Sequence, residues 1–597
     1  MRFLCPTRLS RFAGALFAFS ALAASLTALD SSRQQLKSAD TAFHAGYAAE
    51  KNGDLVTAKQ EFEKVVRLVP DIAEGHTALG SILVRLDLPQ QAIRELERSL
   101  VLKPDDRTTQ INLAMAYEQS GNHEKSLEWF RFLERSSAMP LPPSGAIFYI
   151  RALAATGNTE LALQKAQDAV TANREIAGLH DMLGTLQAQR QDWNSAVIQF
   201  NEALHIDPKF AEAYLHRGVA LMVQQRTAES VKSLTTAAQL SPQSAFTQIE
   251  LGKALIANGE NAEAVPILLR ALALDSSSRD AKYHLGLALQ GSAQEQQAIA
   301  ILQEVIAADP HNAPALTNLG LSLVQTGKSK DAIPLYERAL AETPNDALVH
   351  QGLGVAYLQE GNLDDAVSEF RTGLKLSPEA YELHYDLGLA LKLKDDMAGA
   401  TSELEQAARL NPSSPDPPYT LGILRMQMGQ FDDAVDNFKA ALRLRPENGD
   451  GWAVLGSVFK QQNKLADATD ALQKAIELMP AQPGPHTTLA RVLGQQGRTA
   501  EAAAERKKAS ELTQVAVNRQ RATFETNTGN IWLQKGAILD AIAHYREAIN
   551  SDPNHMEAHR QLAVALERQG RSAEANEELQ KADQLEKHAT PGTSSAR

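Results

Sequence analysis

Histidine is the residue type in this sequence with the most chemistry to offer, because it can bind metals and transfer protons near neutral pH. The chain has 15 histidines, and six of them recur in phase with a spacing of about 34 residues. These six are His76, His180, His350, His384, His486 and His559. A residue type that repeats in phase indicates packing or surface, and not one metal site. The pair His555 and His559 has the spacing of zinc ligands, but its glutamate is Glu557 and the His-Glu-x-x-His order of metalloproteases does not occur, so the sequence predicts no metal ligands and no cofactor.

Motifs for nucleotide binding and nucleophilic catalysis are missing or out of context. Gly352-Leu353-Gly354 resembles the start of a dinucleotide-binding loop, but the surrounding pattern is helical and no strand precedes it. Gly327-Lys328-Ser329 lacks the first glycine of a Gly-x-x-x-x-Gly-Lys-Ser phosphate loop, because Ser322 stands at that position, and no Gly-x-Ser-x-Gly elbow occurs. Acidic pairs such as Asp364-Asp365 are expected at helix N-termini, where they offset the helix dipole. The sequence therefore predicts no catalytic residues and a protein that is not an enzyme.

The elements that carry these residues follow one repeating unit. Six prolines lie 34 residues apart, at Pro310, Pro344, Pro378, Pro412, Pro446 and Pro480. With this proline at position 32 of a 34-residue unit, position 8 is mostly glycine, position 20 alanine and position 24 a large residue, as in Gly354, Ala366 and Phe370. We interpret the unit as two antiparallel helices that cross at the small residues. The proline ends the second helix, because it lacks an N–H and disfavours helix in the residue before it.

About sixteen such units resemble the tetratricopeptide repeat family over residues 39–589. The resemblance implies an all-α fold, a right-handed α-solenoid of about 16 helix-turn-helix repeats of 34 residues. It also implies that the first helix of each hairpin lines the concave side. Because such arrays serve many tasks, the resemblance predicts the fold and not the partner.

The two ends of the chain and two irregular joints complete the expected organisation. We expect a signal peptide over 1–23, a lead-in over 24–38, the array over 39–589 with joints near 137–143 and 506–524, and a disordered tail over 590–597. No proline or glycine occurs between Thr499 and Thr528, which predicts a lengthened helix. In the last unit, Asn576 and Asp583 replace the apolar residues of positions 21 and 28. A repeat array needs such a polar terminal face for solubility.

The N-terminus and the charge bear on location and partners. Three arginines precede an apolar run, and Ala21-Leu22-Ala23 fits the pattern of a cleavage site. We expect an exported chain, periplasmic or secreted; the alternative is an uncleaved inner-membrane anchor facing the periplasm, the one case in which membrane contact is expected. The formal net charge is −13 and no basic tract of five residues occurs, so a nucleic-acid partner is not expected. The single cysteine, Cys5, permits no disulfide.

A candidate binding surface follows from the family geometry, in which positions 2, 5, 9 and 12 of each first helix face the concave side. In the middle units these positions are rather apolar, and the predicted partner-binding groove comprises Met222, Tyr283, Leu287, Tyr385, Leu389, Tyr419, Ile423 and Met426. A long exposed apolar strip marks a binding site. The alternative is that neighbouring units bury these residues as core. Lys253 and Lys392 are isolated among apolar neighbours in sequence, so a grip on a terminal carboxylate is not expected.

The sequence thus favours a protein-protein interaction scaffold in the bacterial cell envelope, which binds protein or peptide segments along an apolar concave groove. One alternative is an accessory subunit of an envelope export or polysaccharide-assembly machine. A less favoured alternative is the regulatory array of a glycosyltransferase-type enzyme, since neither the asparagine ladder nor the catalytic domain of such enzymes is found. The oligomeric state stays open.

Overall fold

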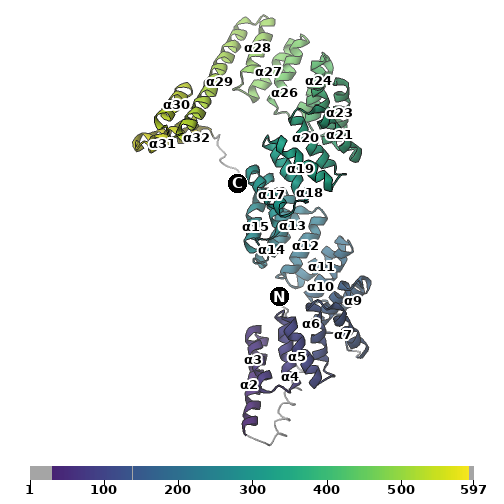
Figure 1. Ribbon diagram of the computed structural model, residues 1–597. Coiled ribbons are helices and arrows are strands. Elements are labelled where there is room, and N and C mark those ends of the chain that lie inside the picture. The colour runs from purple at the N-terminus through teal and green to yellow at the C-terminus, as the bar shows by residue number, and fades with distance from the viewer. Residues whose placement is uncertain (1–29, 137–138, 590–597) are drawn as a thin grey trace. The chain divides into compact units, whose positions relative to one another are not determined.

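The computed structural model describes residues 30–136 and 139–589, and these residues form helices and connecting turns without any strand (Figure 1). The predicted signal peptide, residues 24–29 of the lead-in and the tail over 590–597 lie outside the described residues. None of the helices that the structure describes combines the length and the apolar character needed to cross a membrane. The all-α prediction is confirmed.

The chain divides into two compact units, one up to Pro310 and one from His311, and each is described by itself. The first unit contains α2 (Asp30–Lys51), α3 (Leu55–Leu68), α4 (Ala73–Arg85), α5 (Pro89–Leu102), α6 (Arg107–Gln119), α7 (His123–Ser136), α8 (Pro143–Ala155), α9 (Thr159–Ala172), α10 (Ala177–Gln189), α11 (Trp193–Ile206), α12 (Ala211–Val223), α13 (Thr227–Leu240), α14 (Ala245–Ala257), α15 (Asn261–Leu274), α16 (Arg279–Gly291) and α17 (Glu295–Ala308). Even-numbered helices are the first helices of hairpins and odd-numbered helices the second.

The second unit continues the same alternation. It contains α18 (Ala313–Gln325), α19 (Ser329–Glu342), α20 (Ala347–Gln359), α21 (Leu363–Leu376), α22 (Tyr381–Leu393), α23 (Met397–Leu410), α24 (Asp416–Gln427), α25 (Phe431–Leu444), α26 (Gly449–Gln461), α27 (Leu465–Leu478), α28 (Pro483–Gln495), α29 (Thr499–Gln534), α30 (Ile538–Ser551), α31 (Met556–Arg568) and α32 (Ser572–Ala589). The alternation shifts at α29, whose first part is a second helix and whose last part is a first helix.

Close crossing of the two helices of a hairpin depends on the glycine of position 8. A Cβ atom on Gly354 would lie 2.5 Å from the Phe370 ring, so no larger residue fits without movement. Ala366 and Phe370, at positions 20 and 24 of the same unit, are both 0% exposed. The predicted crossing at small residues is confirmed. The large residue of position 24 packs onto the glycine of its own hairpin, whereas the sequence does not tell which hairpin it contacts.

Helix ends also follow the repeat. Gly361, in the turn within a hairpin, has φ of 79°, a left-handed conformation that glycine adopts without steric cost. α19 ends at Glu342, two residues before Pro344, and Asp346 caps the next helix by accepting a hydrogen bond from the Leu348 N–H. Asp364 and Asp365 lie in the first turn of α21, as predicted.

A recurring set of hydrogen bonds, which we call the histidine clasp, ties hairpins together at position 4. His76 Nδ1 lies 2.6 Å from Glu95 Oε2 on the second helix of the same hairpin, and His76 Nε2 lies 2.9 Å from the carbonyl oxygen of Pro70, at the end of the preceding hairpin. Both contacts recur at His350 with Glu369 and Pro344, at His384 with Glu403 and Pro378, and at His559 with Glu578 and Pro553. This agrees with the packing interpretation of the in-phase histidines.

The stack is interrupted at α29 and ends at α32. The lengthened helix expected here is present, and it is one continuous helix of 36 residues (Figure 1). At an internal hairpin, Val435 and Leu442 of positions 21 and 28 are 5% and 4% exposed. Their counterparts in α32, Asn576 and Asp583, are exposed, so the terminal face is polar as predicted.

Candidate protein-interaction site

Within each unit the first helices line the inner side of the stack. First helices of successive hairpins contact one another, as α4 does α6, α14 does α16 and α18 does α20. Among the described residues, second helices of successive hairpins make no comparable contact. Because elements on the inner side of a curved stack lie closer together, this difference places the first helices on the concave side.

All eight residues predicted to form the groove lie on first helices and are half-buried: Met222 on α12, Tyr283 and Leu287 on α16, Tyr385 and Leu389 on α22, and Tyr419, Ile423 and Met426 on α24. Three belong to the first unit and five to the second, so they form two inner faces and we treat each by itself. Half-burial means that each side chain contributes to the packing of its hairpin and also reaches solvent.

The inner face of the second unit centres on two tyrosines. Tyr385 Oη lies 3.2 Å from Thr420 Oγ1 of the next hairpin, and the Tyr419 ring packs edge-on against Phe438 with centroids 5.7 Å apart. Burial raises the pKa of both hydroxyls, and the nearby carboxylates of Asp416, for Tyr385, and Asp450, for Tyr419, raise it further. Each tyrosine thus lies within the electrostatic reach of an acidic residue on the following hairpin.

Acidic residues accompany the apolar strip of this face. Glu382, Asp416 and Asp450 occupy position 2 of three successive first helices and are exposed. Asp386, on α22, is half-buried and accepts a hydrogen bond from Gln351 Nε2 of the preceding hairpin at 2.7 Å. Burial raises the pKa of Asp386 to about 6, against the lowering effect of the Gln351 hydrogen bond. The face therefore combines apolar side chains with carboxylates, one of them poorly solvated.

Sequence reasoning did not find Asp386 or its partner. Gln351 and Asp386 are 35 residues apart, and the same separation joins Tyr385 to Thr420. It also joins Asp181 to His216 in the first unit. Polar residues at position 5 of one unit and position 6 of the next were the available signal.

The inner face of the first unit carries charged side chains that pair with one another. His216 Nδ1 lies 2.8 Å from Asp181 Oδ1, and although burial opposes charge on His216, this carboxylate raises its pKa. Lys253 Nζ lies 2.9 Å from Glu250 and 2.7 Å from Asp280. The expectation that Lys253 is isolated among apolar neighbours is therefore wrong, because residues of position 6 and of the next hairpin converge on it.

Tyr283 and Leu287 lie beside this charged cluster on α16. The Tyr283 ring packs edge-on against His284, with centroids 5.2 Å apart. Met222 packs against the apolar core between α12 and α14. In the part of the chain that the structure describes, no three histidine, cysteine or acidic side chains gather as they would around a metal ion.

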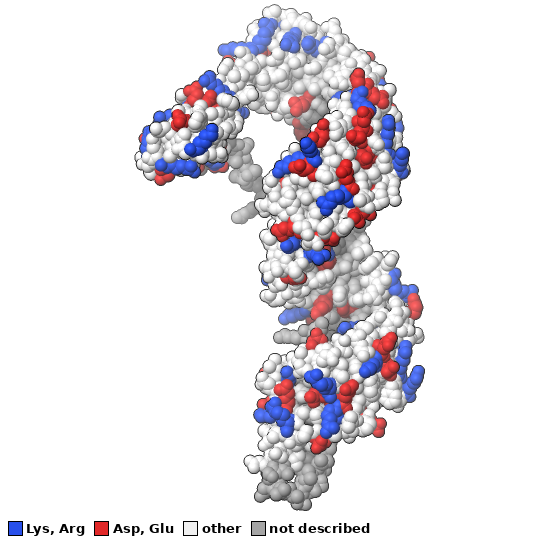
Figure 2. Space-filling view, in the orientation of Figure 1, with Lys and Arg blue, Asp and Glu red and all other residues white. Residues whose placement is uncertain are grey.

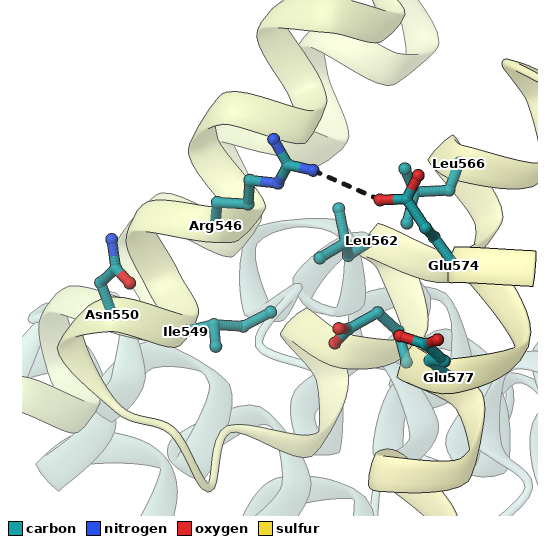
Figure 3. Close-up of a pocket in the computed structure, with 8 residues that line it drawn as sticks. Arg546, Ile549, Asn550, Leu562, Leu566, Glu574 and Glu577 are labelled. Atoms are coloured by element: carbon teal, nitrogen blue, oxygen red, sulfur yellow. Dashed lines mark ion pairs between the residues drawn. The ribbon is translucent and has the colours of Figure 1, made fainter. Parts of the chain in front are cut away.

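A cavity of about 240 Å³ lies between the last hairpins of the second unit, and Figure 3 shows its lining. Arg546 of α30 points toward Glu574 of α32, and their side chains are 3.8 Å apart (Figure 3). Leu562 and Leu566 of α31 form its apolar part. Glu574 also pairs with Arg571. Two of the three acids in its lining, Glu574 and Glu578, already have cationic partners, so the cavity has little charge left with which to hold a ligand.

Figure 2 shows Lys, Arg, Asp and Glu interspersed over the visible faces of both units, with many acidic side chains over α21 to α24. Such a distribution carries no continuous basic stripe of the kind that follows a nucleic-acid backbone. The fold defines the class of the protein as an array of stacked helical hairpins.

The chain is a tetratricopeptide-repeat protein. Residues 77–140, 182–245 and 249–296 match the family described as tetratricopeptide repeat, and residues 529–570 match the family described as TPR repeat. Residues 279–526 match the family described as the C-terminal domain of cilia and flagella-associated protein 70. The periodic glycine, alanine and proline positions described above agree with these matches.

Similar proteins share the repeat at low identity. Protein FlbA of Caulobacter vibrioides is 26% identical over 173 residues, which make up 29% of this chain and 23% of that protein. The yeast Tom70 structure is 17% identical with a TM-score of 0.35, and covers 72% of this chain and 96% of its own. MamA 41-end from Desulfovibrio magneticus RS-1 is 24% identical with a TM-score of 0.27, and covers 28% of this chain and 96% of its own. The match to the curated relative spans less than a quarter of that protein's length.

Proposed function

We propose that this chain is a scaffold of the bacterial cell envelope that holds a segment of a partner protein on the inner face of its second unit. Tetratricopeptide repeats as a class make protein-protein interaction scaffolds, and the fold is typically non-catalytic. The observation that carries the proposal is the cluster of Tyr385, Leu389, Tyr419, Ile423 and Met426, which are half-buried side chains on two adjacent first helices. Tyrosine offers a rigid apolar ring with one polar atom, which suits it to contact surfaces.

The carboxylates beside the strip define the chemistry of the partner. Asp416 and Asp450 lie near the hydroxyls of Tyr385 and Tyr419, and Asp386 is held at the same face by Gln351. A segment with Lys or Arg next to apolar residues would offset the charge of these groups while covering the tyrosines. A segment with acidic side chains would bring like charges together, which costs affinity.

Site-specific photo-crosslinking in the native host tests the proposal. The probe replaces Tyr385 on the inner face, and a control probe replaces Asp365, which is exposed on α21. We expect one discrete adduct from Tyr385 alone, identified by mass spectrometry. Equal labelling from both sites, or no adduct from either, would leave the strip as packing only.

Combined substitution of Tyr385→Ser and Tyr419→Ser measures the contribution of the face. Removing two aromatic anchors should weaken binding of the crosslinked partner by about tenfold or more, by isothermal titration calorimetry. The matched control is Leu444→Ser on α25, where the leucine is 44% exposed on a second helix. A large drop in melting temperature with unchanged affinity would identify the tyrosines as core.

The cellular location has its own test. The proposal of export is supported by the arginines and the apolar run before Ala23. A fusion of the chain to a phosphatase that is active only outside the cytoplasm should show activity, and deletion of residues 1–29 should abolish it. Activity of the truncated fusion would contradict export through this segment.

A further inference from the structure

α29 runs without a break from one hairpin into the next, whereas the chain turns at every other described junction between hairpins. Its buried residues are Ala502, Ala509, Ala522, Thr526, Gly529 and Leu533. Between Ala509 and Ala522 no side chain is fully buried, so this part of the helix has no apolar core of its own. Its last part forms the hairpin with α30 but has no separate second helix of a preceding hairpin to pack on.

Positions 3 and 10 of a first helix face the preceding hairpin and are buried in all other first helices from α4 to α31. The buried residues of position 10 are Ile82, Ala116, Ala152, Leu186, Ala220, Ala254, Ala288, Ser322, Ala356, Ala390, Leu424, Val458, Val492 and Ala565. In α29 these two positions are Phe524, which is 67% exposed, and Ile531, which is 52% exposed. The continuous helix therefore exposes apolar side chains at positions that the repeat otherwise buries.

Uncovered faces elsewhere in the chain have a different composition. Positions 3 and 10 of α2, which starts the first hairpin, are Thr41 and Ala48, and both are exposed. On α32, the exposed residues of positions 21 and 28 are Asn576 and Asp583. Val517, 52% exposed, lies one heptad before Phe524, and Ile531 lies one heptad after it, so the three share one side of the helix. We call Val517, Phe524 and Ile531 the α29 stripe.

The occupant of the α29 stripe should be a helix, because the same positions receive a second helix in every other hairpin. Its charge follows from the neighbouring residues. The segment from Arg506 to Ile531, which includes the stripe, carries five cationic residues, Arg506, Lys507, Lys508, Arg519 and Arg521, against two acids, Glu511 and Glu525, in a chain of net charge −13. Over α28 and the start of α29, the visible face in Figure 2 carries blue rather than red side chains.

Part of this positive charge is already offset. Arg521 lies 2.7 Å from Glu547 and Arg519 3.8 Å from Asp552, both acids being on or next to α30. Lys507 lies 4.0 Å from Glu511. Counting Glu511, Glu525, Glu547 and Asp552, the segment keeps an excess of one positive charge, and this excess lies at Arg506 to Lys508. An antiparallel α29 of a second copy would bring like charges together, whereas an acidic helix would find opposite ones.

We propose that the α29 stripe docks an amphipathic helix of a partner protein, with apolar residues seven apart and acidic flanks. This site is separate from the inner face of the second unit and does not depend on it. The partner helix takes the place of the second helix that the continuous α29 leaves out.

Two synthetic 18-residue helical peptides test the proposal by fluorescence anisotropy with the full chain. They share the apolar heptad positions and carry either Glu or Lys on the flanks. The Glu peptide should bind saturably, and the affinity of the Lys peptide should be lower by about tenfold or more. Combined Phe524→Ser and Ile531→Ser substitution should weaken the Glu peptide about tenfold or more with an unchanged melting temperature. Leu539→Ser, at a 69% exposed residue of α30, should change nothing.

Several results would overturn this docking site. They are no saturable binding of the Glu peptide, equal binding of the two peptides, and a large loss of melting temperature in the Phe524 and Ile531 variant. Sedimentation that shows a dimer dissociated by this variant would assign the stripe to a second copy instead. The Tyr385 and Tyr419 variant should bind the Glu peptide as the unchanged chain does, which separates this test from that of the inner face.

Discussion

At the scale of single residues, the histidine clasp explains why an ionisable side chain recurs at position 4. Both acceptors of His76, the Glu95 carboxylate and the Pro70 carbonyl, need a proton on the ring nitrogen that faces them. The hydrogen bond to Glu95 raises the pKa of His76 most, against the opposing effect of burial. His180 has Gln199 in place of the glutamate, at 2.8 Å, and so provides an uncharged version in the same chain.

The clasp makes part of the stability pH-dependent. Because the folded pKa of His76 is raised, its contribution is complete below the unfolded value of about 6.5 and is lost as pH rises through the folded pKa. Glu95→Gln should reduce the loss of stability between pH 6 and 9, by about 1 kcal/mol or less. Gln199→Glu should add such a loss at His180. Chemical denaturation across this range checks both, and parallel curves for all three proteins would contradict the clasp.

The raised pKa of Asp386 also makes stability fall as pH rises, but in a lower pH range and because burial disfavours its charged form. Its folded pKa of about 6 exceeds the ordinary aspartate value of 3.8, so stability falls as pH rises from about 4 to about 6, because the unfolded chain gives up the proton first. Asp386→Asn should therefore be more stable at pH 7 by on the order of 1 kcal/mol, and this difference should vanish near pH 4. Asp365→Asn, at an exposed residue, is the control. Denaturation at the two pH values is the measurement.

At the scale of elements, the two helices of a hairpin cross closely because position 8 carries no side chain. Gly354→Leu would drive atoms into the Phe370 ring, which its Cβ alone would approach to 2.5 Å. We expect a loss of about 1–3 kcal/mol confined to α20 and α21, since overpacking forces local shifts. Hydrogen exchange should show early loss of protection there, with α26 and α27 unchanged. Loss of protection over the whole unit in one step would contradict a local effect.

Hairpins and their crossings could be predicted from sequence because glycine, alanine and proline recur in phase, as at Gly354, Ala366 and Pro378. Lys253 was misread because Glu250, three residues before it on the same helix, was overlooked, and because Asp280 reaches it only through the stacking of the next hairpin. The uncovered stripe of α29 was also missed. The exposure of Phe524 is unusual only in comparison with position 3 of the other first helices from α4 to α31, where the residue is buried.

At the scale of the molecule, a stack of hairpins is stabilised by contacts between neighbours. At α29 the second unit relies on a single helix in place of such contacts. Val515 is 52% exposed within this bare segment. Val515→Pro should break the helix locally, with an intrinsic cost of about 3 kcal/mol, and leave the cores on both sides folded.

Hydrogen exchange followed by mass spectrometry checks this expectation. Protection should disappear around residue 515 and persist in α28 and in α30 to α32. Val515→Ala controls for the lost side chain. Unfolding of α30 to α32 in the proline variant would show that these hairpins depend on the bare segment for their own stability.

The length of α29 between Ala509 and Ala522 also sets the angle of α30 to α32 about the axis of this helix. Each residue of an α-helix advances by about 1.5 Å and turns by about 100°. Deleting one residue between Ala509 and Ala522 would therefore swing α30 to α32 about the helix axis by more than a quarter turn, whereas deleting seven would nearly restore their orientation. Length changes in this segment should be tolerated in steps of seven or eleven residues, so that the angle at which the last hairpins meet a partner is encoded in the length of one helix.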